Sequence, residues 1–538
     1  MQPNKVQRII KKYTGLVAIA ITFFLFLILN LIATPLINSG DDTFFMYTLG
    51  GGYGEAPTNL LHYNYGWHFF LGSAVKFLFT AFPGTNWYSV TLLFFHITGC
   101  SCVLYVLLKR LKAGTALLLF SLLFFFIEIR LLLSLTFTGA SFVAAAGSAC
   151  LLIYQLKQNR KWALSTFFAL FFLVLAGMLR LQIVWLVVFL FSAVAVTMLT
   201  RKQLFGWLAC VGIVIVLLFG FNKIHEGYYK KNIAGWEQQE KFRQALFYAY
   251  NRQLSPSSVF QDSVEEQLFY AGFLYDSVKF NTVRITEITR QITRKRSLLR
   301  KEDRQGLYWF FVEMRIYIVL VGVIIFLLLT QKRYQPIRKW LFALLAFFVI
   351  HAYLFVFLKI TMPIHLGLLF FLVVSLCMHL EKRDSIFTEA SKNILIPAAI
   401  FLVSLYCWMG IRVWKENEEN KKKYQQFLCM VGELNKHRDS LFVATDDAFL
   451  LHYFYIWNTP KQFPARNLLY KDRLITHTYL QTLSRFGITN LDSALLYNKN
   501  VFLVGGVLPA LEKKEKAVKL SAPDPQYNCL QVRRLIFQ

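Results

Sequence analysis

Two neighbouring carboxylates, Asp41 and Asp42, follow the first long apolar run of the chain, in the segment SGDDTFFMYTLGGG. Two adjacent acids repel each other and are costly to bury, so a water-facing turn is the simplest explanation. A carboxylate at the boundary between water and lipid can also act as a general base that takes the proton of an attacking hydroxyl. We take Asp41 as the candidate base, with Asp42 assisting. Glu55, just after the glycines, is a weaker acidic candidate.

Further charged residues lie near the ends of apolar runs, where a partner or a cavity usually explains them. Glu128 and Arg130 fall within one such run and are expected either as an internal ion pair or as a second acidic site. Arg180, Lys359 and His365 lie at turns between runs. A cation there could snorkel to the interface, or it could offset the charge that grows on a leaving phosphate. We expect these three residues to contact a donor phosphate.

Several other chemistries leave no signature in the sequence. There is no Cys-x-x-Cys spacing, HExxH motif, P-loop, GxGxxG motif or Ser/His/Asp signature. A divalent cation, Mg or Mn, could bind at Asp41 and Asp42, and no other cofactor is expected.

The net charge of +28 is spread between apolar runs instead of forming one patch with stacking aromatics. Nucleic acid is therefore not an expected partner, whereas membrane lipids are.

The elements that must position these residues are predicted to be membrane-spanning helices. Of the 538 residues, 56% are hydrophobic, and they occur in runs of a length that crosses a hydrocarbon core of roughly 30 Å. About eleven helices are expected, over residues 14–37, 87–108, 114–133, 138–156, 162–179, 183–200, 204–222, 311–330, 339–358, 363–380 and 393–411.

The orientation follows from basic loops that recur on one side of these helices. Cytoplasmic loops are enriched in Lys and Arg. Counting residues 66–82 as a span would place the later basic loops outside, so this segment is predicted to be an interfacial or re-entrant helix at the outer face. The basic N-terminus is then cytoplasmic, and Asp41, Arg180 and Lys359 share the outer face. The basic loops cover residues 109–112, 157–161, 201–202, 332–339 and 382–383.

Three regions are expected outside the cytoplasm. Residues 38–86 form a first outer loop with interfacial helices. Residues 223–310 form a long loop whose basic amphipathic helix carries Arg290 and Arg294, which are weaker phosphate candidates. Residues 412–538 contain two strand-like segments and suggest a small α/β domain. The predicted fold class is an all-α polytopic membrane protein, with residues 1–411 as the membrane module and a C-terminal extracytoplasmic α/β domain.

The segment from Ser39 to Gly52, placed directly after a first spanning helix, resembles the start of the first outer loop in the GT-C superfamily. These polytopic glycosyltransferases use polyprenyl-phosphate sugars, and they include aminoarabinose transferases and protein O-mannosyltransferases. The resemblance implies an inverting transferase in which an Asp after the first helix is the base or a metal-associated residue. Residues 359–365 are similar to a GT-C turn, with Lys359 in place of Arg. The likeness covers residues 1–411 by architecture.

The leading hypothesis is a transferase in a bacterial inner membrane, with its C-terminal domain in the periplasm. It would move a sugar from a polyprenyl-phosphate carrier to an unknown acceptor on the outer face. One alternative is a polysaccharide polymerase or ligase acting on lipid-linked oligosaccharide, which the basic loop 223–310 would suit. Another is a non-enzymatic transporter or flippase, which predicts internal repeats and charged or broken helices at mid-bilayer.

Overall fold

The structure is a computed structural model, and helices dominate it. It describes residues 13–54, 56–61, 67–159, 163–251, 281–295, 315, 317–325, 338–357, 361–380, 392–444, 453–470, 477–489, 491–504, 518–520, 532–533 and 535–537.

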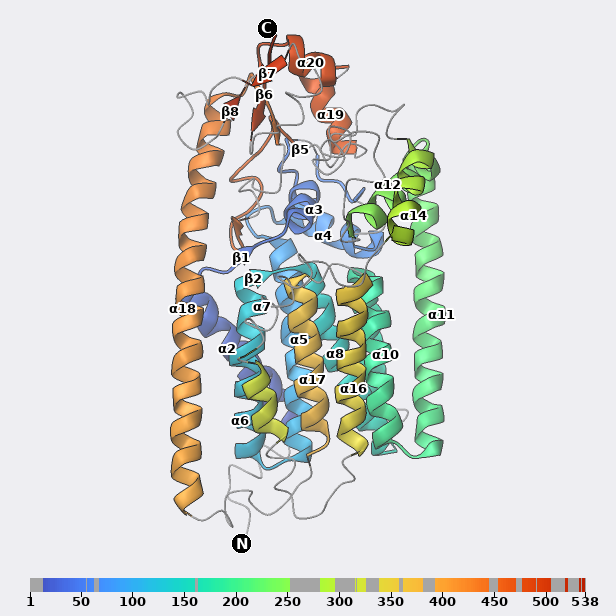
Figure 1. The fold of residues 1–538 in the computed structure, drawn as a ribbon, viewed down its shortest axis with the longest axis vertical. Helices are drawn as coiled ribbons and strands as arrows, with labels where there is room; N and C mark the ends of the chain where they lie inside the picture. The colour runs from blue at the N-terminus through green and yellow to red at the C-terminus, as the bar shows by residue number, and fades with distance from the viewer. Residues whose placement is uncertain are drawn as a thin grey trace.

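Long apolar helices stand side by side in the lower part of the molecule (Figure 1). The bounds of most of them match the expected spans within two residues, because an apolar run near 20 residues fixes both the helix and its length. They are α2 (Thr14–Ile32), α5 (Trp87–Arg110), a third helix (Ala113–Leu133) made of α6 (Ala113–Leu123), the π-helical turn η1 (Phe124–Glu128) and α7 (Ile129–Leu133), and α8 (Phe137–Lys157), α9 (Leu164–Leu179), α10 (Leu181–Met198), α11 (Arg201–Asn232), α16 (Arg338–Phe357) and α17 (Met362–Met378). Helix α2 ends at Ile32 instead of residue 37, α11 is longer than expected, and most of the expected span 311–330 lies outside the described residues.

Helix α8 is the centre of this bundle. It packs against α5, α9, α10 and α17, and nearly all of its side chains are buried. Small residues make this possible: at Gly99 of α5 and Gly147 of α8 an added Cβ would lie closer than 3.0 Å to the backbone of the other helix. Small residues at a helix interface let two backbones approach in this way. The ends of α5 and α8 are therefore held in fixed relative positions.

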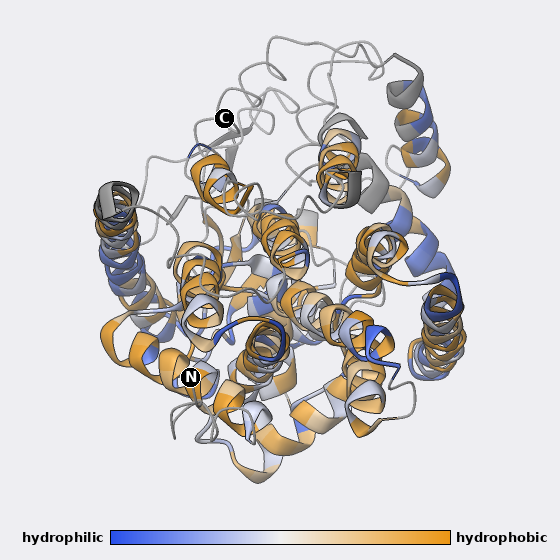
Figure 2. Cartoon of the chain, turned by 90° about the horizontal axis from the view of Figure 1, so that it is seen from below, coloured by the Kyte–Doolittle hydropathy of each residue, from blue (hydrophilic) through white to orange (hydrophobic). Residues whose placement is uncertain are grey.

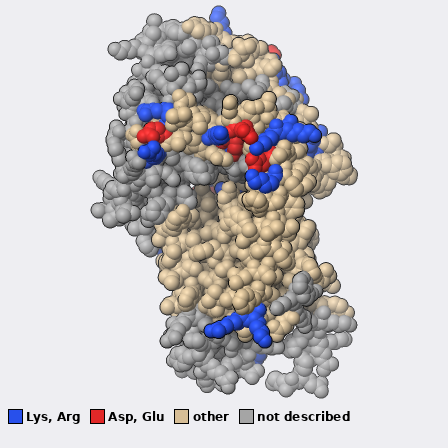
Figure 3. Space-filling model, turned by 90° about the vertical axis from the view of Figure 1, so that its right-hand side faces the viewer, with Lys and Arg blue, Asp and Glu red and all other residues tan. Residues whose placement is uncertain are grey.

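The surface of the bundle fits a lipid environment. Residues 203–222 of α11 contain no charged residue and span about 30 Å as a helix, the thickness of a hydrocarbon core. Figure 3 shows this side of the molecule, with charged groups near the lower end and again higher up, and an uncharged band between them. From below, apolar residues colour most of the bundle helices (Figure 2). Six helices within the described ranges are long and apolar enough to cross a membrane.

The segment predicted at residues 66–82 forms α4 (Phe69–Ala81). Its 13 residues reach only about 20 Å, which is too short for a hydrocarbon core of roughly 30 Å. It packs on α3 (Gly40–Gly50) and α5 near the upper end of the bundle (Figure 1). This geometry agrees with a helix that does not span.

Two helices continue far beyond the apolar runs that predicted them. Helix α11 reaches Asn232 instead of residue 222, and α18 (Lys392–Lys436) continues past residue 411 for a total of 45 residues, about 68 Å. In Figure 1, α18 runs along the whole bundle and up to the C-terminal region. Beside the top of α11 lie α12 (Trp236–Asn251) and α14 (Thr282–Lys295), which pack on each other.

The C-terminal region has the α/β character that its sequence suggests. Strands β5 (Leu468–Tyr470), β3 (Leu441–Ala444) and β6 (Val501–Val504) are parallel, and β8 (Val532–Arg533) adds an antiparallel edge to β6. Helices α19 (His477–Arg485) and α20 (Leu491–Tyr497) lie between β5 and β6 in the chain. Strand β7 (Val518–Leu520) pairs with β9 (Leu535–Phe537) in a separate antiparallel pair.

This region is attached to the first outer loop by backbone pairing. Strand β1 (Leu36–Ile37) follows α2 and pairs with both β2 (Ser134–Leu135) and β4 (Phe454–Tyr455). The Tyr47 hydroxyl of α3 donates to the Phe463 carbonyl (2.8 Å). The C-terminal region therefore sits directly on the helix that carries the acidic pair.

Candidate active site

The acidic pair lies in the first turn of α3, a helix with well-formed ends. Ser39 caps its N-terminus by accepting a hydrogen bond from the Asp42 amide (3.5 Å), and Gly51 ends it with a φ of 72°. Acids in a first turn are favoured by the helix dipole. Successive residues diverge by about 100° around a helix. As a result Asp42 is fully buried, while Asp41 is only half-buried.

The Asp42 carboxylate bridges three elements. Its Oδ1 accepts a hydrogen bond from the Tyr88 hydroxyl of α5 (2.6 Å) and another from the Phe137 amide at the start of α8 (2.7 Å). Thr136 caps α8 at that point. The carboxylate therefore lies between the N-termini of α3 and α8, where amides and helix dipoles stabilise an anion. Oδ2 is buried and has no hydrogen-bond partner within the described parts of the chain.

These contacts oppose the cost of burying the charge. Burial raises the pKa of Asp42 from its ordinary 3.8 to about 7, and the nearby Asp41 charge adds to that rise. The hydrogen bonds from Tyr88, the Phe137 amide and Ser39 act in the other direction and lower the pKa. Burial has the larger effect, so Asp42 changes charge near neutral pH.

Arg180, which lies between α9 and α10, contacts the same first turn of α8. It precedes α10, and its guanidinium donates to the Thr138 hydroxyl and lies 5.0 Å from the centroid of the Phe137 ring. The amide of Phe137 holds Asp42. The first turn of α8 thus contacts Asp42 through the Phe137 amide and Arg180 through the Thr138 hydroxyl and the Phe137 ring.

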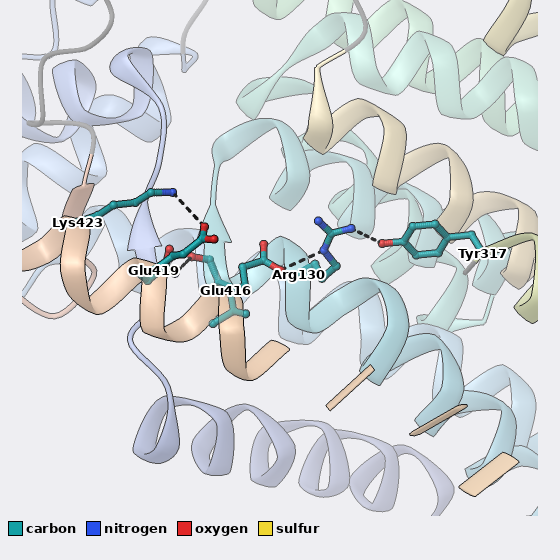
Figure 4. Close-up of polar contacts among 7 residues, drawn as sticks. Arg130, Tyr317, Glu416, Glu419 and Lys423 are labelled. Carbon is teal, nitrogen blue, oxygen red and sulfur yellow. Dashed lines mark hydrogen bonds and ion pairs between the residues drawn. The ribbon is translucent and has the colours of Figure 1, made fainter. Parts of the chain in front are cut away.

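Glu128 and Arg130, predicted as a pair or a second acidic site, each contact another helix. Oε1 of Glu128 lies 2.6 Å from Nδ1 of His96 on α5, and both side chains are fully buried. Arg130 donates to Glu416 of α18 (3.2 Å) and to the Tyr317 hydroxyl (2.6 Å), as Figure 4 shows. The two residues therefore help to join separate helices.

The other predicted residues lie elsewhere or outside the described chain. Nδ1 of His365 on α17 is 3.2 Å from Nε2 of His351 on α16. Arg290 on α14 is exposed, 3.9 Å from Glu287, whereas the side chain of Arg294 on the same helix is not described. Lys359 and Glu55 fall outside the described residues, so their roles stay predictions.

The acidic pair is the predicted site of a divalent cation. Oδ2 of Asp42 lacks a partner among the described residues, but Asp41 leaves α3 in a different direction. No three His, Cys, Asp or Glu side chains gather for a metal within those ranges. A Mg²⁺ ion commonly takes one or two carboxylates and completes its shell with waters and substrate phosphates. A cation at this pair remains a prediction on these terms.

Two solved structures align with the chain. They are ArnT from Cupriavidus metallidurans in the apo state (TM-score 0.42, 10% identity) and the same protein bound to undecaprenyl phosphate (TM-score 0.39, 11% identity), each over 97% of both chains. The overlap is one of coarse architecture. No protein-family model and no curated protein sequence matches the chain.

The sequence did not point to three buried residues at the site: Tyr88, Trp67 and His96. Tyr88 holds Asp42, Trp67 stacks on Tyr88 with ring centroids 4.6 Å apart, and His96 pairs with Glu128. His96 offered a signal, because an ionisable residue inside an apolar span usually has a partner. Tyr88 and Trp67 offered none, since aromatic residues at the ends of spans are common.

Proposed function

We propose that this protein transfers a sugar from a polyprenyl-phosphate donor to a hydroxyl acceptor at the outer face of the membrane. One observation carries the proposal: the first turn of α8 contacts both Asp42 of the acidic pair and Arg180, at one end of a bundle of long apolar helices. Sugar transfer from a phosphate requires a base that takes a proton and a cation that stabilises the leaving group, and this turn contacts a candidate for each.

In the proposed step Asp41 takes the proton of the acceptor hydroxyl. The hydroxyl oxygen forms a bond to the anomeric carbon as the bond from that carbon to the phosphate oxygen breaks. A single displacement of this kind inverts the configuration. The polyprenyl phosphate leaves with the bonding electron pair, and Arg180 offsets its charge. Lys359 is proposed as a second phosphate contact.

The choice of Asp41 as the base rests on accessibility. A general base must come within hydrogen-bond reach of the proton it takes. Asp41 is half-buried, whereas Asp42 is fully buried and already holds two donors on Oδ1. Asp42 therefore supports the site, and Asp41 meets the acceptor.

The orientation is proposed from charge and cysteine chemistry. The N-terminal segment is basic, which favours the cytoplasm. Cys429 lies near the C-terminal end of α18 and is disulfide-bonded. Disulfides persist in oxidising compartments such as the periplasm. The C-terminal region, packed on α3, would then lie outside the cytoplasm and help to bind the acceptor. A reporter fused after Gln538 should be active only outside; a cytoplasmic signal would contradict this orientation.

Activity can be tested with purified protein and defined donors. Polyprenyl-phosphate monosaccharides, a lipid-linked oligosaccharide and a donor-free control would be incubated with wild type and with Asp41→Asn and Arg180→Ala. We expect sugar release from the monosaccharide donor, with losses of at least roughly a hundredfold in Asp41→Asn. Asp439→Asn, at an exposed position, serves as the matched control.

Each competing function predicts a different result. Release from the oligosaccharide donor alone would favour a polymerase or ligase. Wild-type transfer by a folded Asp41→Asn variant would remove Asp41 from the catalytic role. Movement of donor across a vesicle bilayer without sugar release would favour a flippase.

A further inference from the structure

The Tyr88 hydroxyl reaches the Asp42 carboxylate from a separate helix, α5, and donates a 2.6 Å hydrogen bond to Oδ1. The Tyr88 ring is fully buried and stacks on Trp67, which is also fully buried, with an interplanar angle of 18°. Stacking against a buried indole limits the rotation of the Tyr88 ring, and the hydroxyl is thereby directed at Oδ1. This contact is preorganised by side chains that lie outside α3.

Trp67 is itself held by its neighbours in sequence. The His68 amide donates to the Met178 carbonyl (2.7 Å), two residues before Arg180, and Nε2 of His68 donates to the Phe221 carbonyl of α11 (2.8 Å). The segment that supports Tyr88 is therefore anchored to the turn that carries the cation.

We propose that Tyr88 is a positioning residue: supported by Trp67, it holds Oδ1 of Asp42, and Asp42 in turn fixes the first turn of α3, with Asp41, against the first turn of α8. The inference rests on the proposed function, since it takes Asp41 as the base. Tyr88 itself touches no substrate in this scheme. Its contribution is to hold the Asp42 carboxylate in place between two helix N-termini.

Few other ionisable groups face Asp42. Asp41 acts from α3 and Tyr88 from α5, while α8 contributes the Phe137 amide, with Arg180 beyond the Thr138 hydroxyl. A donated hydrogen bond favours the charged carboxylate. Removing the Tyr88 hydroxyl should therefore make Asp42 easier to protonate, an effect that a purely structural tyrosine would not have.

The test compares Tyr88→Phe with Tyr105→Phe, the same change on the same helix, where the Tyr105 ring packs near Tyr154. Infrared spectra of the protonated carboxyl would be titrated with pH, with Asp42→Asn identifying the band. We expect the Tyr88→Phe midpoint to rise by roughly one pH unit or more, and the Tyr105→Phe midpoint to stay at the wild-type value.

Transfer kinetics provide the second readout. Tyr88→Phe should lower kcat roughly ten- to a hundredfold and leave the donor KM within about twofold, because the base is misplaced while the phosphate contacts remain. Trp67→Leu should shift the midpoint in the same direction, and Trp67→Phe, which can still stack, should restore it. These two variants carry the test if Tyr88→Phe does not fold.

The outcomes separate this inference from the proposed function. An unchanged midpoint in folded Tyr88→Phe and Trp67→Leu would overturn the role of Tyr88, even if the enzyme transfers sugar. A shifted midpoint in a protein that transfers no sugar would leave the Asp42 contact intact and overturn the proposed function, and with it the role of Asp41.

Discussion

Nδ1 of His96 lies 2.6 Å from Oε1 of Glu128, and neither side chain reaches the surface. The pair joins α5 to the π-helical turn η1 within the bundle. His96 also lies beside the first turn of α8, since its Cε1 would be 3.8 Å from a Cβ on Gly139. The His96–Glu128 pair therefore packs beside the first turn of α8, and the Phe137 amide of the same turn binds Asp42.

Breaking this pair should be costly. Glu128→Leu or His96→Leu leaves one buried polar group without its partner, and we expect each to lower the free energy of unfolding by roughly 3–5 kcal/mol. The double variant should lose less than the sum, because both polar groups are removed together. Thermal unfolding in detergent checks this. Strictly additive losses would show that the two side chains do not depend on each other.

The spanning helices were predictable because a bilayer imposes a length. The run at residues 138–156 became α8 (Phe137–Lys157), within one residue at either end. The end of a helix was harder to predict than the edge of the membrane. Helix α18 continues past residue 411 into a segment rich in Glu and Lys, both good helix formers. Hydropathy marks where such a helix leaves the lipid, and not where it stops.

The site was predictable only in part, for a different reason. The sequence grouped Asp41 with Arg180 on a predicted common membrane face, and this grouping stays a prediction. The burial of Asp42 depends on Tyr88, 46 residues further along the chain, and on the Phe137 amide, 95 residues further. The partner of Glu128 is likewise 32 residues away, on α5. Local patterns cannot reveal such pairings, because helix packing creates them.

The stability of the Asp42→Asn variant relative to that of the wild type should increase as pH rises. The pKa of Asp42 increases from 3.8 to about 7 on folding, so the folded protein holds this proton more tightly than the unfolded chain. Raising the pH from about 4 to about 7 therefore removes up to roughly 4 kcal/mol of stability from the wild type through this group.

Asparagine has no such titration, and this difference can be measured directly. The melting temperature of Asp42→Asn minus that of wild type should be larger at pH 8 than at pH 5. A difference that stays constant over this range would contradict the raised pKa.

Arg130 should contribute more to stability than an exposed cation on the same stretch of structure. It is buried and donates to Glu416 and Tyr317, so Arg130→Met leaves two polar groups without a donor and should cost roughly 2–4 kcal/mol. Lys421→Met is the matched control: Lys421 is 51% exposed in its ion pair with Glu418, and its loss should stay within about 0.5 kcal/mol. Equal effects in denaturant unfolding would mean that Arg130 does not hold α18 to the bundle.

The close approach of α5 and α8 should be sensitive to a single methyl group. A Cβ on Gly99 would lie closer than 3.0 Å to the Val143 carbonyl, and one on Gly147 equally close to the backbone of Gly99. Backbone atoms cannot move aside as a flexible side chain can, so alanine at either position must push the helices apart. Overpacking of this kind costs roughly 1–3 kcal/mol.

The shift should also reach the site, because α5 carries Tyr88 and α8 carries the amide that holds Asp42. Gly99→Ala should therefore lower transfer activity by more than its loss of stability explains. Gly212→Ala on α11 is the control: it has open space around it, and alanine there should be neutral or stabilising by up to about 1 kcal/mol. Wild-type activity and stability in Gly99→Ala would show that the spacing of α5 and α8 does not set the geometry around Asp42.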